Sequence, residues 1–99
     1  MSRTAPSLAR IDTLLAELRG GVHGGPRDQM LEEAEALRRA VAAFHMEAIR
    51  FRMYSVERLL KGSPNPDLQH AFEQVRTELE AAGFHTRSHA APNAPNAPS

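Results

Sequence analysis

The chain lacks cysteine, and that absence excludes several kinds of site. None of its 99 residues is Cys or Trp. Disulfide bonds, thiolate metal sites and cysteine nucleophiles are therefore excluded. A domain of this size buries only about 60–65% of the surface of its unfolded chain, so its own core gives little stability. Because small domains commonly add a disulfide, a metal or a second subunit, we expect this one to rely on packing and self-association.

Net charge and long apolar runs are also missing. Twelve Lys and Arg balance twelve Asp and Glu. Nucleic-acid-binding proteins usually carry a basic excess, because phosphate contacts supply much of their affinity, so we do not expect a nucleic-acid partner. No stretch reaches the roughly 18 uninterrupted apolar residues of a membrane span, and residues 1–7 contain no signal-peptide core. We therefore expect a cytoplasmic protein that does not contact a membrane.

Glycine and proline are absent from a long central stretch and gather at its two ends. Residues 20–25 include four glycines, residues 62–66 read Gly-Ser-Pro-Asn-Pro, and residues 27–61 contain neither type. Because glycine and proline end helices, this spacing predicts one central helix over 27–61, about 50 Å long. Apolar residues at helical spacing predict shorter helices over about 5–19 and 66–82. The expected fold is all-α: a short–long–short three-helix arrangement in one domain, 1–84, with a bundle completed by dimerisation.

The last predicted helix has recognisable signals at both ends. Asn65 is a good N-cap and Pro66 suits the first helical position. Gly83 suits the residue just past the helix, with Phe84 folding back on the last turn. The segment 85–99 repeats Ala-Pro-Asn and predicts a disordered tail.

Two histidines in that tail have the spacing of a helical metal pair. His85 and His89 are four residues apart, but they follow the helix end and have no other ligand nearby. We therefore expect no metal site, and no other motif in the chain predicts a cofactor.

The central helix has two apolar stripes. The first follows the heptad spacing of a bundle seam, with bulky and small residues in alternation: Met30, Ala34, Leu37, Val41, Phe44, Ala48, Phe51 and Ser55. The second begins only in the second half of the helix and lies nearly opposite the first: Ala42, Met46, Ile49, Met53, Val56 and Leu60. The second half is therefore expected to be buried on two sides.

The two short helices cannot cover all of this surface. Short loops make sequential helices antiparallel neighbours, so each short helix covers one half of the long one and one apolar face is left over. We expect that face to bind a second copy, as a homodimer, or another helical protein. The predicted interface comprises Phe44, Met46, Ile49, Met53, Val56 and Leu60.

Three polar residues lie in one line between the two stripes. Arg38, His45 and Arg52 are spaced by seven residues along the predicted helix. One interpretation is a candidate anion site, in which His45 takes part in proton or phosphoryl transfer. The other, which we favour, places them at the rim of the bundle, where the Arg heads pair with the acidic third helix.

The leading functional interpretation is a non-catalytic protein–protein interaction or assembly module that acts through the central helix. Two families resemble parts of the pattern and give alternatives. The segment Phe44-His45-Met46-Glu47 is similar to the phosphorylated histidine region in the dimerising domains of sensor kinases, which implies phosphotransfer at His45. In those domains an acidic residue directly follows the histidine, whereas Met46 intervenes here.

The other resemblance is topological. The short–long–short helix order resembles the histone fold, which implies a DNA-binding dimer, although the predicted loops here lack paired basic residues. Intertwined helical enzymes such as chorismate mutase also use Arg on a long helix. No matching constellation of Arg, Lys and Glu is found in this sequence, so we expect no enzymatic activity.

Overall fold

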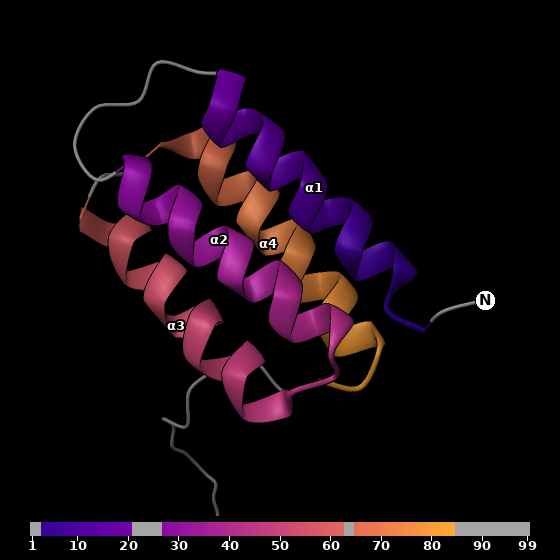
Figure 1. The fold of residues 1–99 in the computed structure, drawn as a ribbon. Coiled ribbons are helices and arrows are strands. Elements are labelled where there is room, and N and C mark those ends of the chain that lie inside the picture. Colours follow the sequence, from indigo (N-terminus) through magenta and orange to yellow (C-terminus); the bar gives the residue numbers. More distant parts are fainter. Residues whose placement is uncertain (1–2, 21–26, 63–64, 85–99) are drawn as a thin grey trace, which may run out of the picture.

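The structure is a computed structural model that describes residues 3–20, 27–62 and 65–84. These residues form four helices: α1 (Ala5–Gly20), α2 (Arg27–Ala42), α3 (Met46–Gly62) and α4 (Pro66–Ala81) (Figure 1). The all-α class is confirmed, and the bounds of α1 and α4 agree with prediction to within a residue. The predicted glycine-rich link and the predicted disordered tail lie outside the described residues.

The prediction of one continuous helix over 27–61 is wrong, because the chain reverses at Phe44. This residue has a φ of 59°, in the left-handed region. The N–H of His45 donates to the carbonyl of Ala40 (3.0 Å), and the N–H of Phe44 donates to that of Val41 (3.1 Å). These two bonds form a Schellman motif, which closes a helix. The carbonyl of His45 then accepts from the N–H of Ile49 (2.9 Å), so α3 begins immediately.

The ring of Phe44 contacts the residue that follows the end of α4, Phe84. It packs against Phe84 at a centroid distance of 6.1 Å. The guanidinium of Arg3 lies over both rings, 5.8 Å from Phe44 and 5.6 Å from Phe84. A non-glycine residue in the left-handed region costs about 1–2 kcal/mol. Contacts of this kind, each worth about 0.5–1.5 kcal/mol, offset that cost.

Both predicted signals at the ends of α4 are confirmed. The N–H groups of Asp67 and Leu68 donate to the side chain of Asn65 at 3.0 and 3.1 Å. At the other end Gly83 has a φ of 99°, and the N–H of Phe84 donates to the carbonyl of Leu79 (2.9 Å). Phe84 is 3% exposed, because it folds back on the last turn.

The four helices form an up–down–up–down bundle (Figure 1). Helix α1 packs against α4 and α2, and α2 packs against α3. The backbones of α3 and α4 do not approach as closely. The bundle is therefore more open along this fourth edge than along the other three.

The reversal changes which stripe is buried. Four of the six residues of the second stripe now face the core: Ile49, Met53 and Val56 are 0% exposed and Leu60 is 2% exposed. Met46 is half-buried and Ala42 is exposed. The expectation that this face lacks cover is corrected, since α3 folds back and buries it within its own chain. The first stripe is buried only as far as Val41, while Phe44 and Phe51 are 51% and 58% exposed.

Candidate functional site: the exposed face of α3

Three large aromatic side chains lie at the surface of the described residues. Phe44 lies in the α2–α3 turn, and Phe51 and Tyr54 lie on α3, where Tyr54 is 48% exposed. Phe51 and Tyr54 are three residues apart, so their rings are neighbours on the helix surface. They lie on the side of α3 that points away from the core. We call this side the α3 face; it comprises Glu47, Arg50, Phe51, Tyr54, Arg58 and Lys61.

Each aromatic ring on the α3 face has an arginine beside it. The guanidinium of Arg52 lies 5.1 Å from the ring centre of Phe51, and that of Arg58 lies 5.8 Å from Tyr54. Such contacts are worth about 0.5–1 kcal/mol at exposed sites. Their effect is to hold flat aromatic and guanidinium surfaces in defined orientations. Rigid Tyr and Arg side chains are the types most enriched among residues that dominate protein interfaces.

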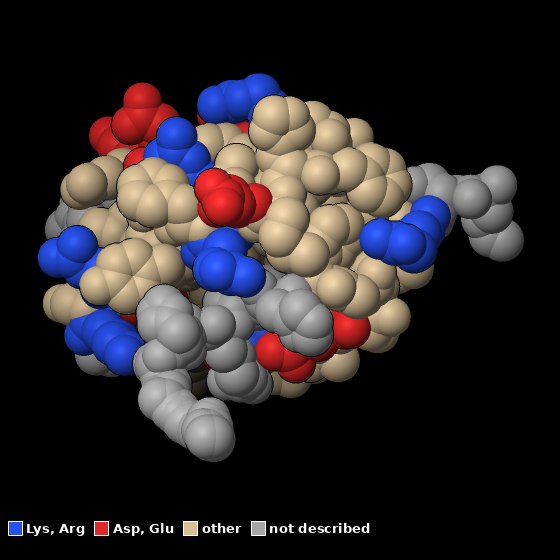
Figure 2. Space-filling view, turned by 90° about the horizontal axis from the view of Figure 1, so that it is seen from below, with Lys and Arg blue, Asp and Glu red and all other residues tan. Residues whose placement is uncertain are grey.

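The charges of the last two helices are of opposite sign. Helix α3 carries four basic and two acidic residues, whereas α4 carries four acidic residues and one Arg. Figure 2 views the molecule from the side on which α3 and the α2–α3 turn lie; basic and acidic groups lie close together over part of this face, and the rest of it is largely uncharged. Although the net charge of the whole sequence is zero, α3 is basic and α4 is acidic.

The structure separates the three residues of the candidate anion site. Arg38 turns toward α1, where its Nε and Nη2 donate to the carboxylate of Asp12 at 2.6 and 3.2 Å. This hydrogen-bonded pair lowers the pKa of Asp12 and raises that of Arg38. Arg52 donates to Glu33 on α2 at 2.8 Å. The two Arg heads do pair with acids at the rim of the bundle, but these acids lie on α1 and α2, not on the acidic α4.

His45 and Arg52 still share one shallow hollow. It measures about 260 Å³ and is lined by Arg39, His45 and Arg52 together with alanines of both helices and of the turn between them, namely Ala36, Ala40, Ala43 and Ala48. His45 itself lies exposed in the turn, at the start of α3. The hollow exists because alanine side chains on both helices leave space between the longer basic ones.

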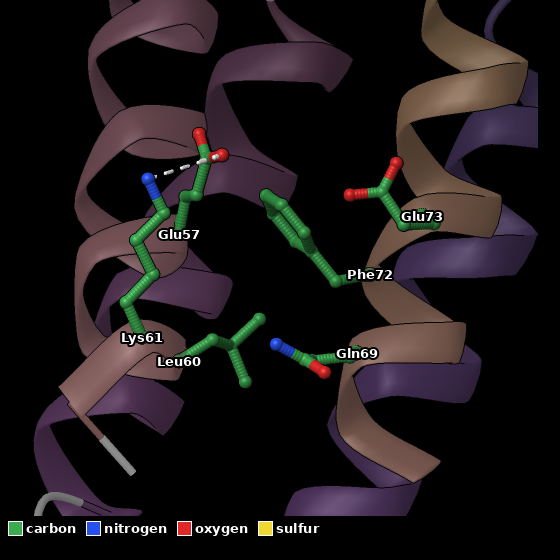
Figure 3. A pocket seen from close by; sticks show the side chains of 6 residues that line it. All are labelled: Glu57, Leu60, Lys61, Gln69, Phe72 and Glu73. Atoms are coloured by element: carbon green, nitrogen blue, oxygen red, sulfur yellow. Dashed lines mark ion pairs between the residues drawn. The ribbon is translucent and has the colours of Figure 1, made fainter. Parts of the chain in front are cut away.

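A second hollow marks the open edge between α3 and α4. It measures about 290 Å³, and Figure 3 shows its six lining side chains. Leu60 of α3 and Phe72 of α4 point toward one another at its centre. The charged groups around them are Glu57 and Lys61 on one side, 4.0 Å apart, and Glu73 on the other.

A buried arginine ties the two sides of this edge together. The side chain of Arg76 is only 2% exposed, and it contacts Glu57 on α3 and Glu73 on α4, each at 3.3 Å. Its guanidinium also lies 5.2 Å from the ring centre of Phe72. Arg76 is the one Arg of the acidic α4, and the structure places its side chain between α3 and α4.

Within the described residues no three His, Asp or Glu side chains come together to hold a metal ion. In those residues no helix is long and apolar enough to cross a bilayer. No protein-family model, curated protein or solved structure matches the chain.

The prediction that Phe51 belongs to a buried seam is wrong, and Tyr54, which belongs to neither predicted stripe, lies beside it on the surface. The signal that could have located both is the change of phase between the two stripes. Because a straight helix keeps its apolar side, a stripe that moves to the opposite side after Val41 indicates a break near Phe44.

Proposed function

We propose that this protein is a non-catalytic helical interaction module whose working surface is the α3 face. The observation that carries the proposal is the adjacent pair Phe51 and Tyr54, 58% and 48% exposed on a helix whose opposite side is fully buried. The predicted interface residues Ile49, Met53, Val56 and Leu60 serve the core instead. The proposal keeps the class of function expected from the sequence and moves the contact surface to the other side of the helix.

Phe51 and Tyr54 leave a large aromatic surface exposed to solvent. A Phe or Tyr ring can remove about 150–250 Å² of surface from water, and here about half of each ring remains uncovered. Both rings stand on a rigid helix, so little conformational entropy is lost when a partner covers them. Arg52 and Arg58 beside the rings add donors that orient the partner.

Site-specific photo-cross-linking in the cells that make the protein tests this proposal. A benzophenone amino acid replaces Phe51 in one variant, Tyr54 in a second and Thr13 in a third. Thr13 is the matched control, because it is an exposed residue on α1, away from the α3 face. We expect cross-linked products from positions 51 and 54 and none from position 13. Equal yields at all three positions, or none at 51 and 54, would contradict the proposal.

Phosphoryl transfer at His45 is a second candidate. The hollow that His45 shares with Arg39 and Arg52 favours it, because guanidinium groups stabilise a bound phosphoryl group. In the test, acetyl phosphate transfers its phosphoryl group to an imidazole nitrogen and acetate leaves; phosphorus NMR records the product. We expect label on the wild-type chain and on His70→Gln, a control at another exposed histidine, but not on His45→Gln. Equal labelling of His45→Gln would reject this candidate.

A further inference from the structure

We propose that, in part of the molecules, the α3 face is covered by the proline-rich segment 90–98 of the same chain. The segment and a partner then compete for Phe51 and Tyr54, and this regulatory consequence rests on the proposed function. Three observations support the contact: the two exposed rings, a period of three among the prolines of the segment, and the place at which the chain leaves the described fold.

The segment 90–98 has the sequence of a polyproline ligand. It reads Ala-Ala-Pro-Asn-Ala-Pro-Asn-Ala-Pro, with a proline at every third position, 92, 95 and 98. A polyproline II helix has three residues per turn and rises about 3.1 Å per residue, so in that conformation the prolines share one edge at intervals of about 9 Å. Proteins recognise such an edge with exposed aromatic rings. The composition that excludes a helix therefore suits docking on an aromatic surface.

The α3 face has the groups that recognise this kind of ligand. Phe51 and Tyr54 are 58% and 48% exposed, and the guanidinium of Arg58 lies 5.8 Å from the ring centre of Tyr54. A polyproline backbone makes no internal hydrogen bonds, so its carbonyls accept from donors such as the Tyr54 hydroxyl and the Arg58 guanidinium. The segment 90–98 contains no charged residue, so the basic side chains of the face do not repel it.

The chain leaves the described fold beside the α3 face. Phe84, the last described residue, packs against Phe44 at a centroid distance of 6.1 Å, and Phe44 lies two residues before α3 begins (Figure 1). Along the axis of α3, Phe51 and Tyr54 lie about 8 and 12 Å from its first residue. Residues 85–91 can span up to about 23 Å, which is enough to bring the first proline of the segment to the rings.

Attachment to the same chain makes a weak contact effective. A binding segment tethered a few residues from its site has an effective concentration of about millimolar. A contact whose dissociation constant is about 1 mM as a free peptide therefore covers the rings in about half of the molecules. Proline limits the entropy lost on docking, because its φ is already fixed. With half of the molecules covered, the apparent affinity for a partner falls about twofold.

Tyr54 itself is the probe, because the chain contains one Tyr and no Trp. Acrylamide quenching of the fluorescence of the purified full chain measures how far solvent reaches its ring. The variant Pro92→Ala/Pro95→Ala/Pro98→Ala removes the shared edge. We expect its Stern–Volmer constant to be about twice the wild-type value, because the covered half of the molecules becomes open. The wild-type value should stay constant over about 1–100 µM protein, since the cover belongs to the same chain.

Two control variants separate this contact from a general change in the chain. Asn93→Gln/Asn96→Gln alters another edge of the polyproline helix and should keep the wild-type quenching. Thr13→Tyr/Tyr54→Phe moves the fluorophore to an exposed position on α1. In that background the three proline substitutions should leave the quenching unchanged.

Equal quenching of the wild-type chain and the triple proline variant would overturn the inference. Shielding that increases with protein concentration would also overturn it, because the cover would then come from another copy. Cross-linking in cells separates this failure from failure of the proposed function. Products at positions 51 and 54 without a proline effect on quenching reject the inference alone. A proline effect without such products supports the contact and rejects the proposed function.

Discussion

Two helix ends in this molecule use the same hydrogen-bond pattern with different residues. Helix α4 ends at Gly83, whose φ of 99° costs a glycine little. Helix α2 ends at Phe44, whose φ of 59° is costly for a residue with a side chain. Both ends lie at the same end of the bundle, where the ring of Phe44 meets that of Phe84. One end is therefore set by local backbone freedom, and the other by a tertiary contact.

The consequence for the fold is large. Without the reversal at Phe44, α2 and α3 would form one rod with an uncovered apolar side. With it, the same side chains complete a core within a single chain, and the aromatic residues Phe51 and Tyr54 move to the surface. A break that local sequence does not signal thus decides which face is available to a partner.

Met53→Glu tests whether the chain reverses at Phe44. It has the largest expected effect on the free energy of unfolding. Met53 is 0% exposed in the core. Loss of its packing and burial of a carboxylate should destabilise the fold by about 4 kcal/mol or more. Urea denaturation followed by circular dichroism measures the change.

Tyr54→Glu is the matched control for that substitution, one position along the same helix on its exposed side. We expect its free energy of unfolding to fall by less than about 1 kcal/mol. If Met53→Glu were as stable as Tyr54→Glu, the buried position of Met53 would be refuted.

Two substitutions at Phe44 separate the stabilisation by its ring contact from the conformational cost of its left-handed backbone. Phe44→Ala loses the contact with Phe84 and keeps the left-handed backbone, so stability should fall by about 1–2 kcal/mol. Phe44→Gly loses the same ring but removes the backbone cost, so it should be about 1 kcal/mol more stable than Phe44→Ala. Thermal unfolding of the two variants side by side gives the difference. Equal stability would argue against a left-handed residue at this position.

Gly83→Ala measures the same backbone cost at the other helix end. A Cβ at position 83 would meet no atom within 4 Å, so steric crowding contributes nothing. We expect a loss of about 1 kcal/mol from backbone conformation alone. This value should agree with the difference between Phe44→Gly and Phe44→Ala. A loss of stability near zero would contradict the claim that both helix ends carry the same backbone cost.

The smallest effect concerns the ion pair that holds α2 against α1 before the turn. Arg38 lowers the pKa of Asp12 in the folded chain, so the pair stabilises the fold above the ordinary aspartate pKa of about 3.9. That contribution is lost as the pH falls through the lowered pKa. Because the Asp12 side chain is 51% exposed, we expect at most about 0.5 kcal/mol. Asp12→Asn should lower stability at neutral pH and match the wild-type chain in strong acid; a gap that persists there would contradict this assignment.

The parts of the fold that local chemistry determines were predictable. Asn65, Pro66 and Gly83 act within a few residues of their own position, and the ends of α4 follow from them. The turn at Phe44 was not predictable in this way, because its cost is offset by Phe84, forty residues later. The change of phase between the stripes is the available signal, but the same pattern also fits a helix buried on two sides.

The candidate site was predictable only in part. Tyr54 belongs to neither apolar stripe, so its exposed position agrees with the helical period, whereas that of Phe51 depended on the break. Rim positions for Arg38 and Arg52 were expected, but their partners Asp12 and Glu33 depend on which helices become neighbours. The burial of Arg76 also depends on which helices become neighbours, because its partner Glu57 lies on α3.

The central claim, that α2 and α3 form a hairpin, is tested most directly by one distance. Since the chain contains no cysteine, single cysteines at Asp28 and Lys61 accept spin labels without competing sites. Both positions are exposed, with side-chain exposures of 96% and 75%. Dilution with unlabelled chain removes distances between copies. Double electron–electron resonance should give about 10–25 Å, as expected for neighbouring helices. A distance near 50 Å, the length of one straight helix over this span, would contradict the account.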